Sequence, residues 1–124
     1  MKPIVTELKP LLEENEIKFR EENDSLFIEL PNCFGELKIY DLDGKDDIVG
    51  LVGSDWHTHS ESLGNPNTKA KNIIEFLLKI FSGQYLLIEE KEPGEKTRKT
   101  IEDDLDAYLK WLPKNSEYKI FNKT

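Results

Sequence analysis

Two short apolar runs separated by a five-residue turn are the feature that most restricts how this chain can fold. Leu26–Leu30 and Glu36–Tyr40 have the length and the residue types of β-strands. Pro31–Gly35 between them has the length and composition of a hairpin connection. Ile48–Val52 follows and is apolar on both faces, which predicts a central strand covered on two sides. The pattern therefore predicts an antiparallel meander.

Apolar residues at helical spacing predict three helices beside these strands. The first should run from about Thr6 to Asn15, with Pro10 near enough to its start to be tolerated. The second follows the chain break at 64–68, and its many apolar residues predict the most buried helix, ending at Ser82–Gly83. The third has an apolar face from Leu105 to Leu112 after a capping-box pattern at 100–103.

The remaining apolar runs predict the other strands. They are Ile17–Arg20, Tyr85–Glu89, Lys96–Ile101 and Tyr118–Phe121. We therefore expect an α+β fold, with a mostly antiparallel sheet of about five to six strands and three helices packed on it. The 124 residues contain no repeat or linker, so we expect a single domain over residues 1–124.

Composition excludes several classes of protein. The net charge of −8 argues against nucleic-acid binding, because phosphates require a basic surface. The longest apolar run contains Glu75 and is followed by Lys79, so no membrane span is expected. Cys33 is the only cysteine, and the N-terminal residues lack a signal-peptide pattern. These features predict a soluble, cytoplasmic protein.

Both histidines lie in the stretch SDWHTHS at 54–60. Side chains two apart on a strand point to the same face, so His57 and His59 have β-carbons roughly 6.6 Å apart, close enough to bind one ion. The alternative is structural: Trp56 ends the strand as a core or rim residue, and the two imidazoles bond to nearby backbone or carboxylates. A zinc site at His57 and His59 is therefore one hypothesis, and no cofactor is the other.

The same stretch resembles two families of metal hydrolases. Asp55-x-His57-x-His59 is similar to the opening motif of PHP-type phosphoesterases, which implies further downstream histidines that this chain lacks. The lead-in Val49–His59 resembles the JAMM-type zinc isopeptidases, whose motif is His-x-His followed by Ser and Asp. Asn67 and Ala70 stand at the Ser and Asp positions. The resemblance therefore implies a degenerate metallohydrolase-like domain that has lost a zinc ligand, not an active metalloprotease.

Two acidic segments are further candidates. Residues 41–47 have some features of a calcium loop but lack its closing Glu, so a hairpin turn is expected. Asp103, Asp104 and Asp106 stand at a predicted helix start, where carboxylates complement the helix dipole. Their functional interpretation is a patch for a basic partner.

Taken together, the sequence predicts a small acidic protein-binding domain that is not an enzyme. In size, acidity and the WHTH strand end before an apolar helix, it resembles small bacterial immunity proteins, which implies occlusion of a basic toxin by an acidic surface. The predicted partner-binding residues are Trp56, His57, His59, Asp103, Asp104 and Asp106. A self-associating domain, with contacts from Phe34, Trp56 and Trp111, is a further alternative.

Overall fold

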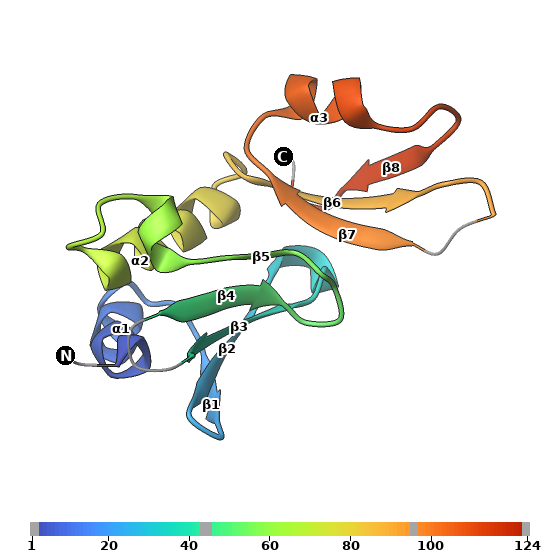
Figure 1. Ribbon diagram of the computed structural model, residues 1–124. Helices are drawn as coiled ribbons and strands as arrows, with labels where there is room; N and C mark the ends of the chain where they lie inside the picture. The colour runs from blue at the N-terminus through green and yellow to red at the C-terminus, as the bar shows by residue number, and fades with distance from the viewer. Residues whose placement is uncertain (1–2, 43–45, 95–96, 123–124) are drawn as a thin grey trace.

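The computed structural model describes residues 3–42, 46–94 and 97–122, and it contains two antiparallel sheets with three α-helices (Figure 1). In chain order the elements are α1 (Ile4–Glu14), β1 (Arg20–Glu22), β2 (Ser25–Glu29), η1 (Pro31–Cys33), β3 (Glu36–Asp41), β4 (Asp47–Leu51), β5 (His57–Thr58), η2 (Ser60–Leu63), α2 (Lys69–Phe81), β6 (Leu86–Lys91), β7 (Arg98–Glu102), α3 (Leu105–Trp111) and β8 (Glu117–Ile120). The predicted α+β class is confirmed.

The first sheet is the predicted meander, with strand order β1-β2-β3-β4-β5. The predicted hairpin of β2 and β3 is present, and it pairs Leu26 with Ile39 and Glu29 with Glu36. The hairpin connection is a short 3-10 turn. The β3–β4 connection pairs Asp41 with Asp47, and the tip of the expected turn at 41–47 lies outside the described residues.

The expectation that β4 is covered on both sides is wrong. Its burial alternates: Val49 and Leu51 are buried, whereas Ile48 and Gly50 are half-buried and Val52 beyond the strand is exposed. The buried face packs with α1 and α2 into one hydrophobic cluster. Ile48 can lie on the other face because an antiparallel sheet commonly packs one face against the core and leaves the other in contact with water. The first sheet therefore keeps a half-exposed outer face.

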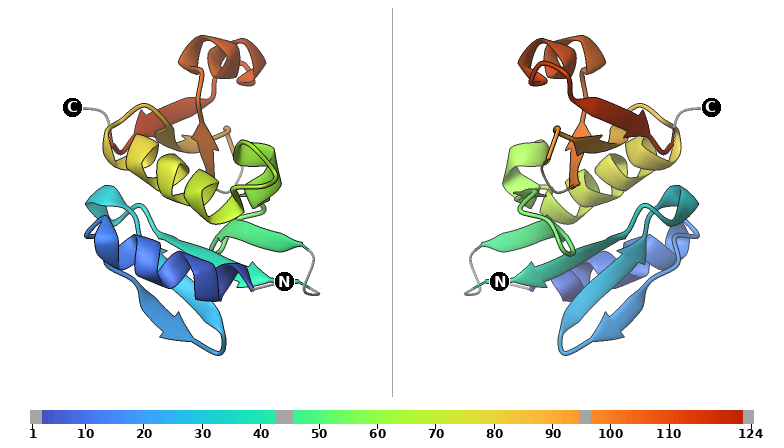
Figure 2. Two further views of the ribbon diagram at one scale, coloured as in Figure 1. Left: turned by 90° about the vertical axis from the view of Figure 1, so that its left-hand side faces the viewer. Right: turned by 90° about the vertical axis from the view of Figure 1, so that its right-hand side faces the viewer.

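The last three strands form a second sheet rather than extending the first. Its order is β7-β6-β8, with β6 antiparallel to both neighbours. Helix α2 lies between the two sheets, and α3 covers the far side of the second sheet (Figure 2). Leu87 and Ile101 join the same buried cluster as the first sheet and α2. The prediction of one sheet is wrong because α2 separates the early strands from the late ones.

Smaller corrections concern the element ends. The first strand begins three residues later than predicted and consists of exposed charged residues. Helix α1 begins at Ile4, where the main-chain N–H donates to Asp41 Oδ1 at 2.9 Å. The N-cap of α3 is Asp104 and not Thr100, which is buried in β7. Within the described ranges, no helix combines the length and hydropathy needed to cross a bilayer.

Candidate functional site

The histidine stretch forms the short edge strand of the first sheet. β5 pairs with β4 so that His57 lies opposite Gly50 and Thr58 opposite Val49. Trp56 stacks on Phe76 of α2, with ring centres 5.9 Å apart and planes within 6°. This packing agrees with the interpretation of Trp56 as a rim residue of the core. Its ring is half-buried, and His57 is exposed.

Both imidazoles have Nδ1 against a main-chain carbonyl. His57 Nδ1 is 3.2 Å from the Asp55 oxygen, and His59 Nδ1 is 2.6 Å from the Asp47 oxygen. Asp46 Oδ1 also lies 3.1 Å from His59 Nδ1. The ring centres are 5.6 Å apart and the ring planes are nearly perpendicular, at 83°. The two histidines therefore lie side by side, as the strand spacing predicted.

A buried carboxylate that the sequence did not single out holds the segment after β5. Asp47 is 3% exposed, and its Oδ1 accepts the Ser60 main-chain N–H at 2.8 Å. Its Oδ2 accepts the Ser60 hydroxyl. A buried carboxylate needs such partners, because an uncompensated one is costly. Asp47 thus contacts His59 through its main-chain carbonyl and Ser60 through its carboxylate.

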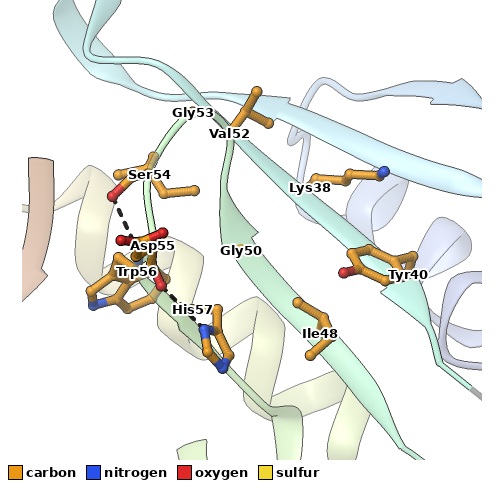
Figure 3. A pocket seen from close by; sticks show the side chains of 11 residues that line it. Lys38, Tyr40, Ile48, Gly50, Val52, Gly53, Ser54, Asp55, Trp56 and His57 are labelled. Carbon is orange, nitrogen blue, oxygen red and sulfur yellow. Dashed lines mark hydrogen bonds between the residues drawn. The ribbon is translucent and has the colours of Figure 1, made fainter.

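An open hollow of about 670 Å³ lies on the outer face of the first sheet, beside His57 (Figure 3). Gly50 forms its floor between Lys38 and Tyr40 on one side and His57 on the other. Lys38 Nζ lies 4.9 Å from the centre of the Tyr40 ring. The charged lining that the structure describes is one lysine and one aspartate, Lys38 and Asp55, so this face differs in charge from the acidic segment near α3.

The acidic segment lines a second, smaller pocket, of about 380 Å³, at the base of α3. Asp103 and Asp104 line it, whereas Asp106 does not. Asp104 Oδ1 also accepts the Ala107 N–H at 3.1 Å as the N-cap, in agreement with the structural interpretation of this run. We call this cavity the acidic pocket. Among the residues that the structure describes, its charged lining consists of Glu90, Glu92, Glu102, Asp103, Asp104 and Arg98.

The sequence offered Trp111 as a contact for self-association and did not place it beside the acidic residues. Trp111 lines the acidic pocket and is 86% exposed, the most exposed large hydrophobic side chain of the described residues. The burial of Glu90 was not predicted either. Glu90 is 5% exposed; its Oε1 is 2.6 Å from Arg98 Nε, and its Oε2 accepts the Tyr108 hydroxyl at 2.8 Å. The burial of Glu90 could have been predicted from Ile88, because residues two apart on a strand point to the same face and Ile88 is buried.

The structure therefore divides the predicted partner-binding residues between two places. His57 lines the hollow of the first sheet, and Asp103 and Asp104 line the acidic pocket beside the second sheet. The two cavities share none of the lining residues that the structure describes. Of the aromatic residues considered for self-association, Phe34 is fully buried, Trp56 is half-buried, and Trp111 is exposed.

The described part of the chain holds no group of three or more His, Cys, Asp or Glu side chains arranged to bind a metal ion. Ala70, at the position of the JAMM aspartate, is buried in α2 and offers no oxygen. Among the described residues, an ion at the histidine pair would therefore find only the two imidazoles as ligands.

Comparisons with known proteins do not extend these observations. No protein family, no curated protein and no solved structure matches the chain. The two cavities are therefore the features of the molecule that bear on its function.

Proposed function

We propose that this protein is a protein-binding domain that receives basic side chains of its partner in the acidic pocket. The observation that carries the proposal is the exposed indole of Trp111 beside five carboxylates in one cavity. An indole face attracts cations, and guanidinium groups stack on it best. Carboxylates on the rim then offer the bidentate acceptors that an arginine requires. The chemistry therefore favours an arginine-bearing partner.

The inner and outer carboxylates of the pocket have different roles. Glu90 at the inner end already pairs with Arg98 and Tyr108, so it is satisfied within the fold. Asp103 is exposed on the rim, where its carboxylate faces solvent. An incoming cation therefore meets the rim first, while buried Glu90 is held inside the fold by its bond to the buried Tyr108 and its ion pair with the exposed Arg98. The exposed Asp103 would therefore contribute to partner binding, and the buried Glu90 to the stability of the fold.

The net charge of −8 supports the same proposal at longer range. An acidic protein attracts a basic partner before contact, which raises the rate of association and makes it sensitive to salt. Occlusion of a basic toxin, as an immunity protein performs it, needs these two properties: fast capture and a charged surface that covers the target. We propose this role for the chain.

Charge reversal of Asp103 tests the proposal, with Asp106 as the matched control. Both residues carry one exposed carboxylate near the start of α3, but only Asp103 lines the acidic pocket. For a blocked arginine–glycine repeat peptide, we expect Asp103→Lys to weaken binding about tenfold, or about 1.4 kcal/mol. Asp106→Lys should change binding by less than about twofold at physiological ionic strength, where screening shortens its reach. Isothermal titration calorimetry provides the measurement, because fluorescence would report Trp56 together with Trp111.

Three outcomes would overturn the proposal. One is equal affinity for a glutamate–glycine repeat peptide, and a second is affinity that does not change with salt. The third is an identical loss in Asp103→Lys and Asp106→Lys, which would indicate net charge alone. For the immunity role, co-expression with a toxin encoded beside the gene should show protection that Asp103→Lys reduces and Asp106→Lys retains. If neither the wild type nor Asp106→Lys protects the cells against the toxin, the immunity role is rejected.

A further inference from the structure

We propose that the partner binds through one extended peptide segment, with a basic residue in the acidic pocket and a carboxylate at Lys38 in the hollow of the first sheet. This mode of binding rests on the function proposed for the acidic pocket and adds a second site to it. His57, one of the predicted partner-binding residues, lines the same hollow as Lys38. A third hollow connects the two sites.

The third hollow, of about 620 Å³, lies between the turn after β4 and the edge strand β7. We call it the middle hollow. Residues 52–55 line both the middle hollow and the hollow of the first sheet. Arg98 lines both the middle hollow and the acidic pocket. The three hollows therefore follow one another along the surface, from the outer face of the first sheet to the base of α3.

The junction between the first two hollows is fixed by the fold and open on one side. Ser54 Oγ donates to the Lys99 carbonyl of β7 at 2.9 Å, which holds the turn against the second sheet. A β-carbon at Gly53 would have no atom within 4 Å, so the space beside the turn is open there. Val52, which lines both hollows, is 49% exposed. A segment that crosses this junction would cover Val52 and remove its apolar surface from water.

The two ends of this row of hollows differ in charge. Of the three hollows, Lys38 lines only the one in the first sheet, and its Nζ lies 4.9 Å from the Tyr40 ring centre and 5.9 Å from that of Phe27. None of the ion pairs between described residues includes Lys38. Asp55, the carboxylate of the same hollow, lies on the other side of β4 from Lys38 (Figure 3). Lys38 can therefore pair with an incoming carboxylate, whereas the acidic pocket at the other end receives a cation.

Calorimetric titration with two series of peptides tests this mode of binding. Each peptide is blocked at both ends and joins an arginine–glycine repeat, through a glycine–serine linker of varied length, to either Glu or Gln, with both chain directions made. Because the protein has a net charge of −8, an added Glu should weaken binding unless it reaches Lys38. We expect the Glu peptide to bind about threefold or more tightly than the Gln peptide, but only when the linker is long enough to span the middle hollow.

Lys38→Gln should remove the advantage of the Glu peptide and leave the affinity of the Gln peptide within about twofold, because Lys38 does not line the acidic pocket. Lys18→Gln is the matched control: Lys18 is exposed and lines none of the three hollows, so the advantage should remain. Lys38→Arg retains the charge and should retain most of the advantage. Circular dichroism checks the fold of each variant, and the comparison of the two peptides on the wild type needs no variant.

The outcomes separate this mode of binding from the function proposed for the acidic pocket. If the Gln peptide does not bind the wild type, that function is rejected, and the extended mode is rejected with it. If the Gln peptide binds but Glu gives no gain at any linker length, the extended mode alone is wrong. A gain that persists in Lys38→Gln would also overturn the extended mode, because the carboxylate would then bind elsewhere.

Discussion

At the scale of single residues, the burial of Glu90 is a feature that the sequence did not predict. Glu90 lies in a run of charged residues that looks solvated, yet it is buried between Arg98 and Tyr108. The sequence correctly placed Trp56 at the rim of the core, but not at the end of the strand that begins at Ile48. That strand, β4, ends at Leu51, and Trp56 precedes β5, which runs antiparallel beside it. The sequence failed at Glu90 because burial there depends on the packing of α3, which is distant in sequence.

Tyr108→Phe tests the cost of the buried contact to Glu90. The change removes the hydroxyl that donates to Oε2 at 2.8 Å and leaves a buried acceptor with one partner fewer. We expect the free energy of unfolding to fall by about 1–3 kcal/mol in urea titrations at neutral pH. Tyr118→Phe, at an exposed tyrosine of the adjacent strand, should stay within about 0.5 kcal/mol.

The same variant should change how stability depends on pH. Burial raises the pKa of the Tyr108 phenol, and the hydrogen bond to the Glu90 carboxylate raises that pKa further. A tyrosine in the unfolded chain titrates near pH 10. Above about pH 10 the unfolded state therefore binds fewer protons than the folded state, and stability decreases as pH rises. Tyr108→Phe should lack this contribution, so its free energy of unfolding should fall less steeply above pH 10 than that of the wild type. If the free energies of unfolding of the two proteins fall in parallel above pH 10, Tyr108 is not the group responsible.

At the scale of elements, the start of α2 shows how a local contact fixes a helix. Asn72 is buried, and its side-chain amide donates to the main-chain oxygens of Ser60 at 3.1 Å and Asn65 at 2.8 Å. These bonds tie α2 to the segment that follows β5. The sequence predicted the helix and its end from apolar spacing, but not this tie, because Asn72 looks like an ordinary polar residue of a helix.

Gly64→Ala should break this tie. A β-carbon at Gly64 would lie 2.7 Å from Asn72 Oδ1 and 2.9 Å from its Cγ, so Asn72 must move and lose its bonds. We expect a loss of about 1–3 kcal/mol in the free energy of unfolding. Gly50→Ala is the control, since its β-carbon would meet Ile48 Cγ2 at 3.5 Å, an ordinary contact. Equal losses in the two variants would show that the Asn72 contact is not the cause.

At the scale of the whole molecule, the sequence predicted the class of fold but not its division into two sheets. Strand pairing between neighbours in sequence was visible, because turns such as Pro31–Gly35 mark it. The position of α2 between the sheets was not visible, since it depends on which apolar faces meet in space. Side-chain bonds also link the sheets: Ser54 Oγ donates to the Lys99 carbonyl at 2.9 Å, and Lys99 Nζ donates to the Phe34 carbonyl.

We expect the two sheets to unfold together as one domain. Their buried side chains form one cluster through α2, so loss of either sheet would expose the apolar side chains of α2 that pack against it. In a Trp111→Phe background, fluorescence reports Trp56 beside the first sheet, and far-ultraviolet circular dichroism reports both sheets. The two urea transitions should coincide. Separate midpoints would instead indicate two independently folding units.

The outer rim of the first sheet has a further consequence. Strand β1 consists of Arg20, Glu21 and Glu22, and Arg20 pairs with Glu22 and Glu36 at 2.9 and 2.6 Å. Another chain that paired with β1 would have to desolvate these charged side chains. The edge strand β1 therefore disfavours the addition of a further strand, and we expect no fibre growth from this edge in concentrated solutions.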